Sequence, residues 1–152
     1  SPTEAWGTPI YHAFALYRRC ASRGITCTCT CPTFDTHAFG TIPALEGVLW
    51  LDAAATLSED GGEIALSVVN RHPSHDIEAR VEAGGTVVGE ERAVLTGGDE
   101  RAATRAAMPD AVAVEVGGLD VAGECFTARF PAHSATVLRL RREVGRPGEP
   151  AC

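Results

Sequence analysis

The chain has 152 residues, a length that suits a single domain with its own hydrophobic core. Its formal net charge is −7, and because such an acidic surface repels phosphate backbones, nucleic acid is not an expected partner. No apolar run approaches the roughly 18 residues of a membrane-spanning helix, so we expect no membrane contact. Composition and charge therefore predict a globular domain.

The first predicted element is an amphipathic helix. Thr8 can serve as its N-cap, and Pro9 fits the first helical position. Ile10, Phe14 and Tyr17 then follow at positions i, i+4 and i+7, which places them on one stripe of the helix. The stripe predicts a helix with one apolar face.

After Gly24, the predicted stop of the helix, the spacing of apolar residues changes to strict alternation. Residues 25–31 are therefore predicted to form a strand that carries Cys27, Cys29 and Cys31 on one face. We interpret these thiols as small buried side chains, with a soft-metal site and disulfides as alternatives. The six cysteines contain no Cys-x-x-Cys pair, so a zinc knuckle is not predicted.

Short apolar runs separated by turn residues fill most of the remaining chain. The predicted strands cover residues 48–56, 63–70, 77–82, 86–95, 111–116, 124–130 and 133–140. The first two of these strands are predicted to form a hairpin, a weaker helix is predicted over 100–108, and the Gly- and Pro-rich residues 142–152 are predicted to be disordered. Since too few helices are available for the crossovers of a parallel sheet, we predict an all-β, antiparallel β-sandwich of jelly-roll or immunoglobulin-like kind.

Residues that could carry chemistry are present but lack a positioning motif. Adjacent carboxylates lie in or near predicted turns: Glu59 with Asp60, Glu90 with Glu91, and Asp99 with Glu100. The histidines are scattered: His12, His37, His72, His75 and His133. No Gly-x-Ser-x-Gly nucleophile motif occurs. We therefore predict no catalytic, cofactor-binding or metal-ligating residue.

The two tryptophans leave one binding function open. Trp6 and Trp50 could stack on sugars, as the aromatic residues of carbohydrate-binding modules do. Trp50 lies inside an apolar run, which favours a place in the core.

Several segments, in the same order, resemble one family, the α-L-arabinofuranosidases of glycoside hydrolase family 51. These segments are Thr8–Tyr17, which resembles the last helix of the catalytic barrel; Pro32–Asp35 and Ile42–Glu46, which resemble the entry into the C-terminal β-sandwich; Ser67–Pro73, a strand and turn; and Phe130–Leu140, the closing strand. Together they span about residues 7 to 141, and the strand with three cysteines departs from the family pattern.

The resemblance implies a retaining hydrolase that releases terminal α-L-arabinofuranosyl groups from hemicellulose-type oligosaccharides. In that family the two catalytic glutamates lie on the (β/α)₈ barrel, upstream of this sandwich, and no position in this chain matches their motifs. We therefore expect an accessory domain that braces the barrel and is not itself catalytic.

The resemblance also implies a domain organisation. Residues 1–23 are expected to be the terminal helix of the barrel, residues 24–141 the C-terminal β-sandwich, and residues 142–152 a tail. The expected partner is the catalytic barrel of the same enzyme, with a homo-oligomer possible, in the bacterial cytoplasm. The alternatives are an independent carbohydrate-binding module and an immunoglobulin-like interaction domain.

Overall fold

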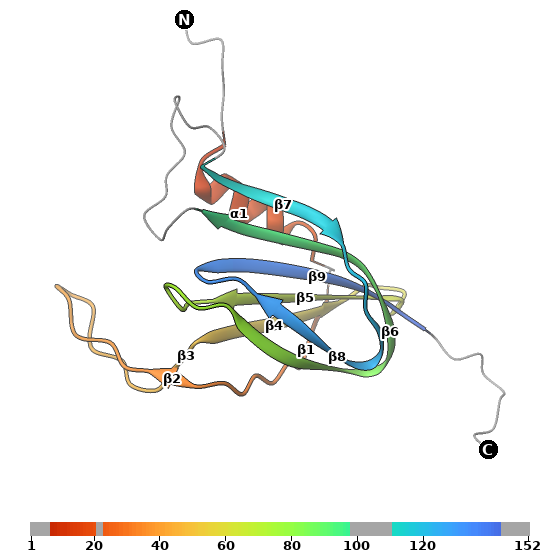
Figure 1. Cartoon of the computed structure of the whole chain (residues 1–152), viewed down its shortest axis with the longest axis horizontal. Helices are drawn as coiled ribbons and strands as arrows, with labels where there is room; N and C mark the ends of the chain where they lie inside the picture. Colours follow the sequence, from red (N-terminus) through yellow and green to blue (C-terminus); the bar gives the residue numbers. More distant parts are fainter. Residues whose placement is uncertain (1–6, 21–22, 98–110, 144–152) are drawn as a thin grey trace, which may run out of the picture.

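The computed structural model describes residues 7–20, 23–97 and 111–143, and it confirms the predicted fold class, an all-β antiparallel sandwich preceded by one helix. The elements are α1 (Pro9–Tyr17), β1 (Arg23–Ile25), β2 (Thr33–Phe34), β3 (Val48–Leu49), β4 (Leu51–Leu57), β5 (Glu63–Asn70), β6 (Ile77–Gly97), β7 (Val112–Gly118), β8 (Ala122–Phe130) and β9 (Ser134–Arg142) (Figure 1). The helix predicted over residues 100–108 and the tail beyond residue 143 lie outside the described residues.

Helix α1 begins as predicted and ends earlier than predicted. Thr8 is the N-cap, and its hydroxyl oxygen accepts a hydrogen bond from the Tyr11 N–H at 3.3 Å. The helix ends at Tyr17 because the next turn tightens, with the Arg19 N–H bonded to the Leu16 carbonyl. The predicted stop at Gly24 is wrong, since Gly24 lies in β1. No described helix has the length and apolar character that a membrane span requires.

The strand predicted over residues 25–31 is mostly wrong. Its pairing with β4 ends at the pair Ile25–Ala55, and residues 26–31 run on without a ladder. We call residues 26–31 the strap. The alternation of cysteine and threonine is that of a strand, but the strap reaches the start of β4 through its thiols instead of its backbone.

The predicted hairpin of β4 and β5 is confirmed, with Leu57 opposite Ile64 and Leu51 opposite Asn70. Asp60 closes its turn by accepting hydrogen bonds from the Ser58 hydroxyl and the Gly62 N–H. Side-chain acceptors of this kind stabilise short turns. The turn signal in the sequence therefore located this hairpin correctly.

The strands predicted over 77–82 and 86–95 form a single bent strand, β6. Its first half pairs with β8 and its second half pairs with both β7 and β9, and the register shifts between Glu82 and Val87. Gly84 has a φ of 68°, so it bends the strand instead of reversing the chain. The bend carries β6 from one layer of the sandwich to the other.

The sheet order is β1-β4-β5-β9-β6-β7, with β8 paired to the first half of β6. Because β6 bends, β8 folds over the inner face of β4, β5 and β9, where Phe130 packs with Leu66 and Leu138. The other face of the sheet is covered by α1, whose Leu16 packs against Ala65, among other residues. The short hairpin of β2 and β3 projects from one end of the molecule (Figure 1).

Candidate functional site: the helix face and the Asn70–Asp76 turn

One side of α1 is anchored on the sheet. Leu16 is fully buried against Ala65, Ala93 and Val137, and the Arg19 guanidinium pairs with Glu91 on β6 at 2.6 Å. A buried leucine and a partly buried ion pair together hold the helix to β5, β6 and β9.

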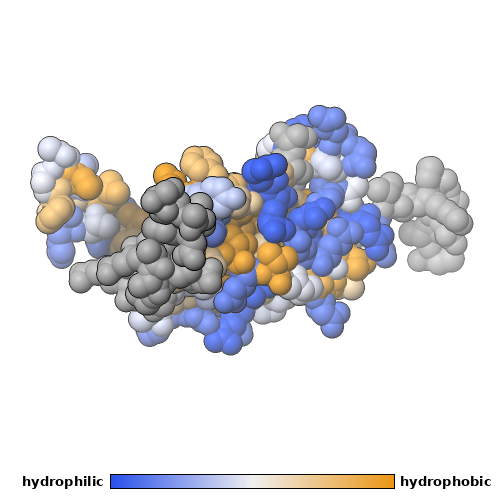
Figure 2. Space-filling view, turned by 90° about the horizontal axis from the view of Figure 1, so that it is seen from above, coloured by the Kyte–Doolittle hydropathy of each residue, from blue (hydrophilic) through white to orange (hydrophobic). Residues whose placement is uncertain are grey.

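The other side of α1 carries the predicted apolar stripe, and the stripe is exposed. Ile10 is 66% exposed, Phe14 68% and Tyr17 42%, and Tyr11 beside them is 62% exposed. Figure 2 views the molecule from the side on which α1 lies in Figure 1 and shows hydrophobic residues gathered between hydrophilic ones. Large apolar side chains gathered on one exposed face are typical of a surface that another protein element covers. We call these four residues the helix face.

The strand and turn over Ser67–Pro73, one of the segments that carry the resemblance, are organised by Asn70. Its side chain is buried, and its amide group donates hydrogen bonds to the carbonyl oxygens of His75 and Phe130, both at 3.0 Å. Its amide oxygen accepts from the His72 N–H at 2.9 Å. Asn70 thus joins the end of β5, the following turn and the end of β8.

Aromatic rings line up beside this turn. Trp50 stacks with Phe34 at a centroid distance of 4.0 Å and contacts the His72 ring at 4.5 Å, and His72 stacks with His75 at 4.3 Å. Trp50 is therefore partly buried and already in contact with two rings. This arrangement agrees with a packing role and leaves Trp50 poorly placed as a sugar platform. Trp6 lies outside the described residues.

The other end of the turn is held by the carboxylate of Asp76. The Asp76 carboxylate accepts a hydrogen bond from the Ala132 N–H at 2.9 Å and pairs with the Arg129 guanidinium at 2.6 Å. These two contacts, the backbone N–H first, lower the pKa of Asp76. His133 lies beside them with a φ of 36°, and its Nδ1 lies 2.9 Å from the Pro73 carbonyl oxygen.

Sequence reasoning missed Asn70, Asp76 and Arg129, although they fix the geometry of this end of the molecule. The only signal was an asparagine at the end of a strand, directly before a proline-containing turn. His72 and His75, two of the scattered histidines, contribute to the turn itself, because the His72 Nδ1 accepts from the His75 N–H at 2.9 Å.

The cysteine prediction needs one correction. Cys29 and Cys31 are half-buried against the core, as expected, whereas Cys27 is exposed. Cys29 donates to the Leu51 carbonyl oxygen at 3.7 Å, and the Cys31 sulfur accepts from the Leu51 N–H at 3.2 Å. Burial, and then the neighbouring thiol of Cys31, raises the pKa of Cys29. The cysteines of the described residues are unpaired, and no group of three or more metal-binding side chains is found among these residues.

Three of the carboxylates that drew attention in the sequence have structural partners, and Glu59 is exposed at the hairpin turn. Glu91 pairs with Arg19 at 2.6 Å, Glu90 with Arg141 at 3.4 Å, and Asp60 closes the hairpin turn. Asp99 and Glu100 lie outside the described residues. That the chain holds no catalytic residue stays a prediction.

These features define a class of protein: an antiparallel β-sandwich whose covering helix leaves an apolar face exposed, as an accessory domain of a larger protein does. The sequence profile described as "Alpha-L-arabinofuranosidase C-terminal domain" matches residues 1–134, and the chain belongs to this family. The match includes α1, so the division between residues 23 and 24 stays a prediction. Comparison with curated proteins finds no match.

Solved structures show the same fold. An α-L-arabinofuranosidase from Thermotoga maritima, in complex with arabinose, superposes with a TM-score of 0.81 at 24% identity, over 88% of this chain and 29% of that chain. A family 51 enzyme from Thermotoga petrophila gives 0.78 at 22% identity, over 91% and 30%. AbfB, a family 51 enzyme from Bifidobacterium longum, gives 0.70 at 23% identity, over 88% and 26%. The chain therefore spans less than a third of the length of these enzymes.

Proposed function

We propose that this chain is the accessory C-terminal sandwich of a family 51 α-L-arabinofuranosidase, and that it braces the catalytic (β/α)₈ barrel through the helix face. The observation that carries the proposal is the two-sided helix: Leu16 is fully buried in the sandwich while Phe14, one half-turn away, is 68% exposed. A helix that is anchored on one side and apolar on the other is suited to sit between two bodies.

The parent reaction would be hydrolysis of terminal α-L-arabinofuranosyl groups with retention. Retention requires two carboxyl groups about 5 Å apart, one acting as acid/base and the other as nucleophile. We assign both groups to the barrel, so the 152-residue chain alone should not release nitrophenol from 4-nitrophenyl α-L-arabinofuranoside. Activity of the purified chain that a substitution within it abolishes would refute this assignment. The bacterial cytoplasm remains the proposed location.

The bracing role is tested with Phe14→Asp, made both in this chain and in the enzyme that contains it. In the chain alone Phe14 contacts mainly solvent, so the substitution should hardly change the melting temperature of the chain. In the enzyme the carboxylate would be buried against the barrel, and the melting temperature should fall by several degrees. Thr127→Asp, on the exposed face of β8, is the matched control. Equal melting temperatures for the enzyme with and without Phe14→Asp would contradict the proposal.

The carbohydrate-binding alternative has less support. It needs an exposed aromatic platform, and the Trp50 ring, the tryptophan among the described residues, already contacts the rings of Phe34 and His72. We therefore do not propose sugar binding.

A further inference from the structure

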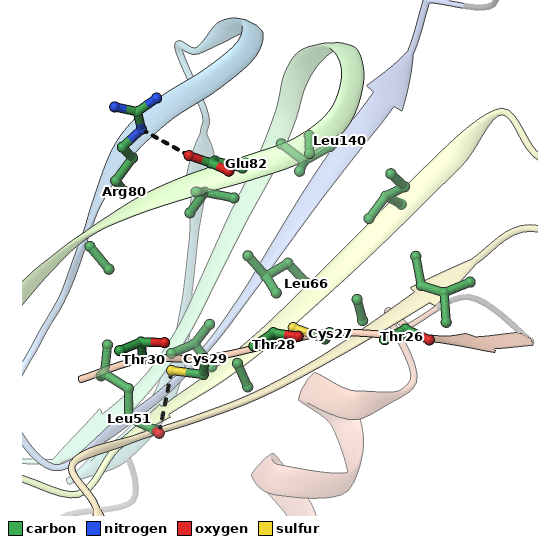
Figure 3. A pocket seen from close by; sticks show the side chains of 18 of the residues that line it. Thr26, Cys27, Thr28, Cys29, Thr30, Leu51, Leu66, Arg80, Glu82 and Leu140 are labelled. Carbon is green, nitrogen blue, oxygen red and sulfur yellow. Dashed lines mark hydrogen bonds and ion pairs between the residues drawn. The ribbon is translucent and has the colours of Figure 1, made fainter. Parts of the chain in front are cut away.

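A cavity of about 240 Å³ lies between the two layers of the sandwich, at the edge that the strap covers (Figure 3). Its walls are the inner sides of β4 and β5 and the first half of β6. Four of the wall positions are alanines: Ala53 and Ala55 from β4, and Ala79 and Ala83 from β6. Protein interiors contain few voids larger than a water molecule, so small side chains on facing strands explain why space remains here.

The strap covers the cavity, and no β-ladder joins the strap to the sandwich. The ladder between β1 and β4 stops at Ile25, and the strap then reaches Leu51 through the sulfur atoms of Cys29 and Cys31. In Figure 3 the strap runs across the view below Leu66, with the Cys29 contact to Leu51 near its Thr30 end. A cover held in this way can be displaced without breaking a β-ladder.

The charged residues at the rim of the cavity do not favour a charged ligand. Arg80 and Glu82 are the charged residues among those that line the cavity, and they pair with each other at 3.3 Å on the exposed side of β6 (Figure 3). The strand residues beneath them are aliphatic apart from Phe130, and the strap adds uncharged threonine and cysteine side chains. A charged ligand would lose its hydration without gaining an unpaired partner.

The volume limits the size of the ligand. Pockets for drug-sized molecules measure about 300–1,000 Å³, whereas an apolar cavity of about 150 Å³ is enough to hold benzene. We propose that this cavity binds a small, uncharged aromatic molecule of one or two rings. The site lies on the face of the sheet opposite α1, so it is independent of the bracing role proposed above.

The test uses indole as the probe and the 152-residue chain. Methyl resonances in ¹H–¹³C spectra should shift saturably for Leu66, Val68, Val81 and Leu140, whose side chains line the cavity. Ala53→Leu fills the space and should weaken indole binding at least tenfold, whereas Ala54→Leu, exposed on the next position of β4, should leave it unchanged. If Ala53→Leu fails to fold, Ala79→Val replaces it in the test. Valine fills less of the cavity and should still weaken indole binding.

Four outcomes would overturn the proposal. The first is the absence of saturable shifts in the unsubstituted chain, and the second is equal weakening by Ala53→Leu and Ala54→Leu. The third is a set of shifts confined to the helix face, which would show that indole binds α1. Nuclear Overhauser contacts from another part of the chain, or from a second copy, to Leu66 would also overturn it, because the space would then already be filled.

Discussion

Replacing Asn70 with alanine should destabilise the sandwich more than its position at the end of a strand suggests. The substitution removes three hydrogen bonds at once: two that the amide donates, to His75 and Phe130, and one that it accepts from His72. Phe130 lies in the core, and its carbonyl would lose this donor, which costs about 1–3 kcal/mol. The two bonds to the turn lie nearer to solvent and contribute about 0.5–1.5 kcal/mol each.

We therefore expect the free energy of unfolding to fall by about 3 kcal/mol. For a domain of this size the melting temperature should fall by about 6–12 °C, at about 2–4 °C for each kcal/mol. Urea unfolding followed by circular dichroism should show a lower midpoint with an unchanged slope, because the folded state buries the same surface.

The matched control is Thr136→Val. Thr136 is fully buried in β9, and its hydroxyl has no hydrogen-bond partner, so this substitution should leave stability unchanged or raise it. A loss below about 1 kcal/mol for Asn70→Ala, or a loss of similar size for Thr136→Val, would refute the reasoning that the Asn70 hydrogen bonds organise the turn.

Three further predictions test other parts of the molecule. Leu16→Ala should lower the free energy of unfolding of the chain by about 2–5 kcal/mol, while Phe14→Ala should change it by less than about 0.5 kcal/mol; equal effects in denaturant titrations would mean that α1 does not belong to the sandwich core. Iodoacetamide followed by mass spectrometry should label the exposed Cys27 before Cys29, whose raised pKa leaves less thiolate, and the reverse order would contradict the strap geometry. The Arg139 hydrogen bond lowers the pKa of Glu63. The stability that this pair contributes to the fold is therefore present at neutral pH and is lost as the pH falls through the lowered pKa of Glu63 in the folded state. Glu63→Gln should therefore cost about 0.5–1 kcal/mol at pH 7 and almost nothing near pH 2, and a pH-independent difference would exclude the ion pair as its cause.

Local signals in the sequence predicted the elements whose geometry is decided locally. The cap at Thr8 and the hairpin turn around Asp60 depend on hydrogen bonds between residues two or three positions apart. The course of β6 depends instead on pairing with β8 and β9, and a glycine pair in the sequence is equally compatible with a hairpin or with a bend. The strap shows the same limit, since its alternating pattern is that of a strand although its ladder with β4 stops at Ile25.

The candidate site likewise contains one part that local sequence signals predicted and one part that they did not. Periodicity alone placed Ile10, Phe14 and Tyr17 on one face of a helix, and the structure shows that this face is exposed. The role of Asn70 could not be predicted, because its partner Phe130 lies 60 positions further along the chain. Contacts over such distances are set by topology, on which a single sequence carries little information.

The place of β9 in the sheet has a consequence for synthesis on the ribosome. Strand β5 pairs on one side with β4, its immediate predecessor, and on the other side with β9. The partner of Val68 is Thr136, so nearly 70 residues must be translated before that edge of β5 is covered, which takes roughly 3–14 s at about 5–20 residues per second. Until then the nascent hairpin presents an open strand edge rich in valine and leucine. We expect ribosome-associated chaperones to be needed most during this interval, and chains that are truncated before β9 to be found in aggregates.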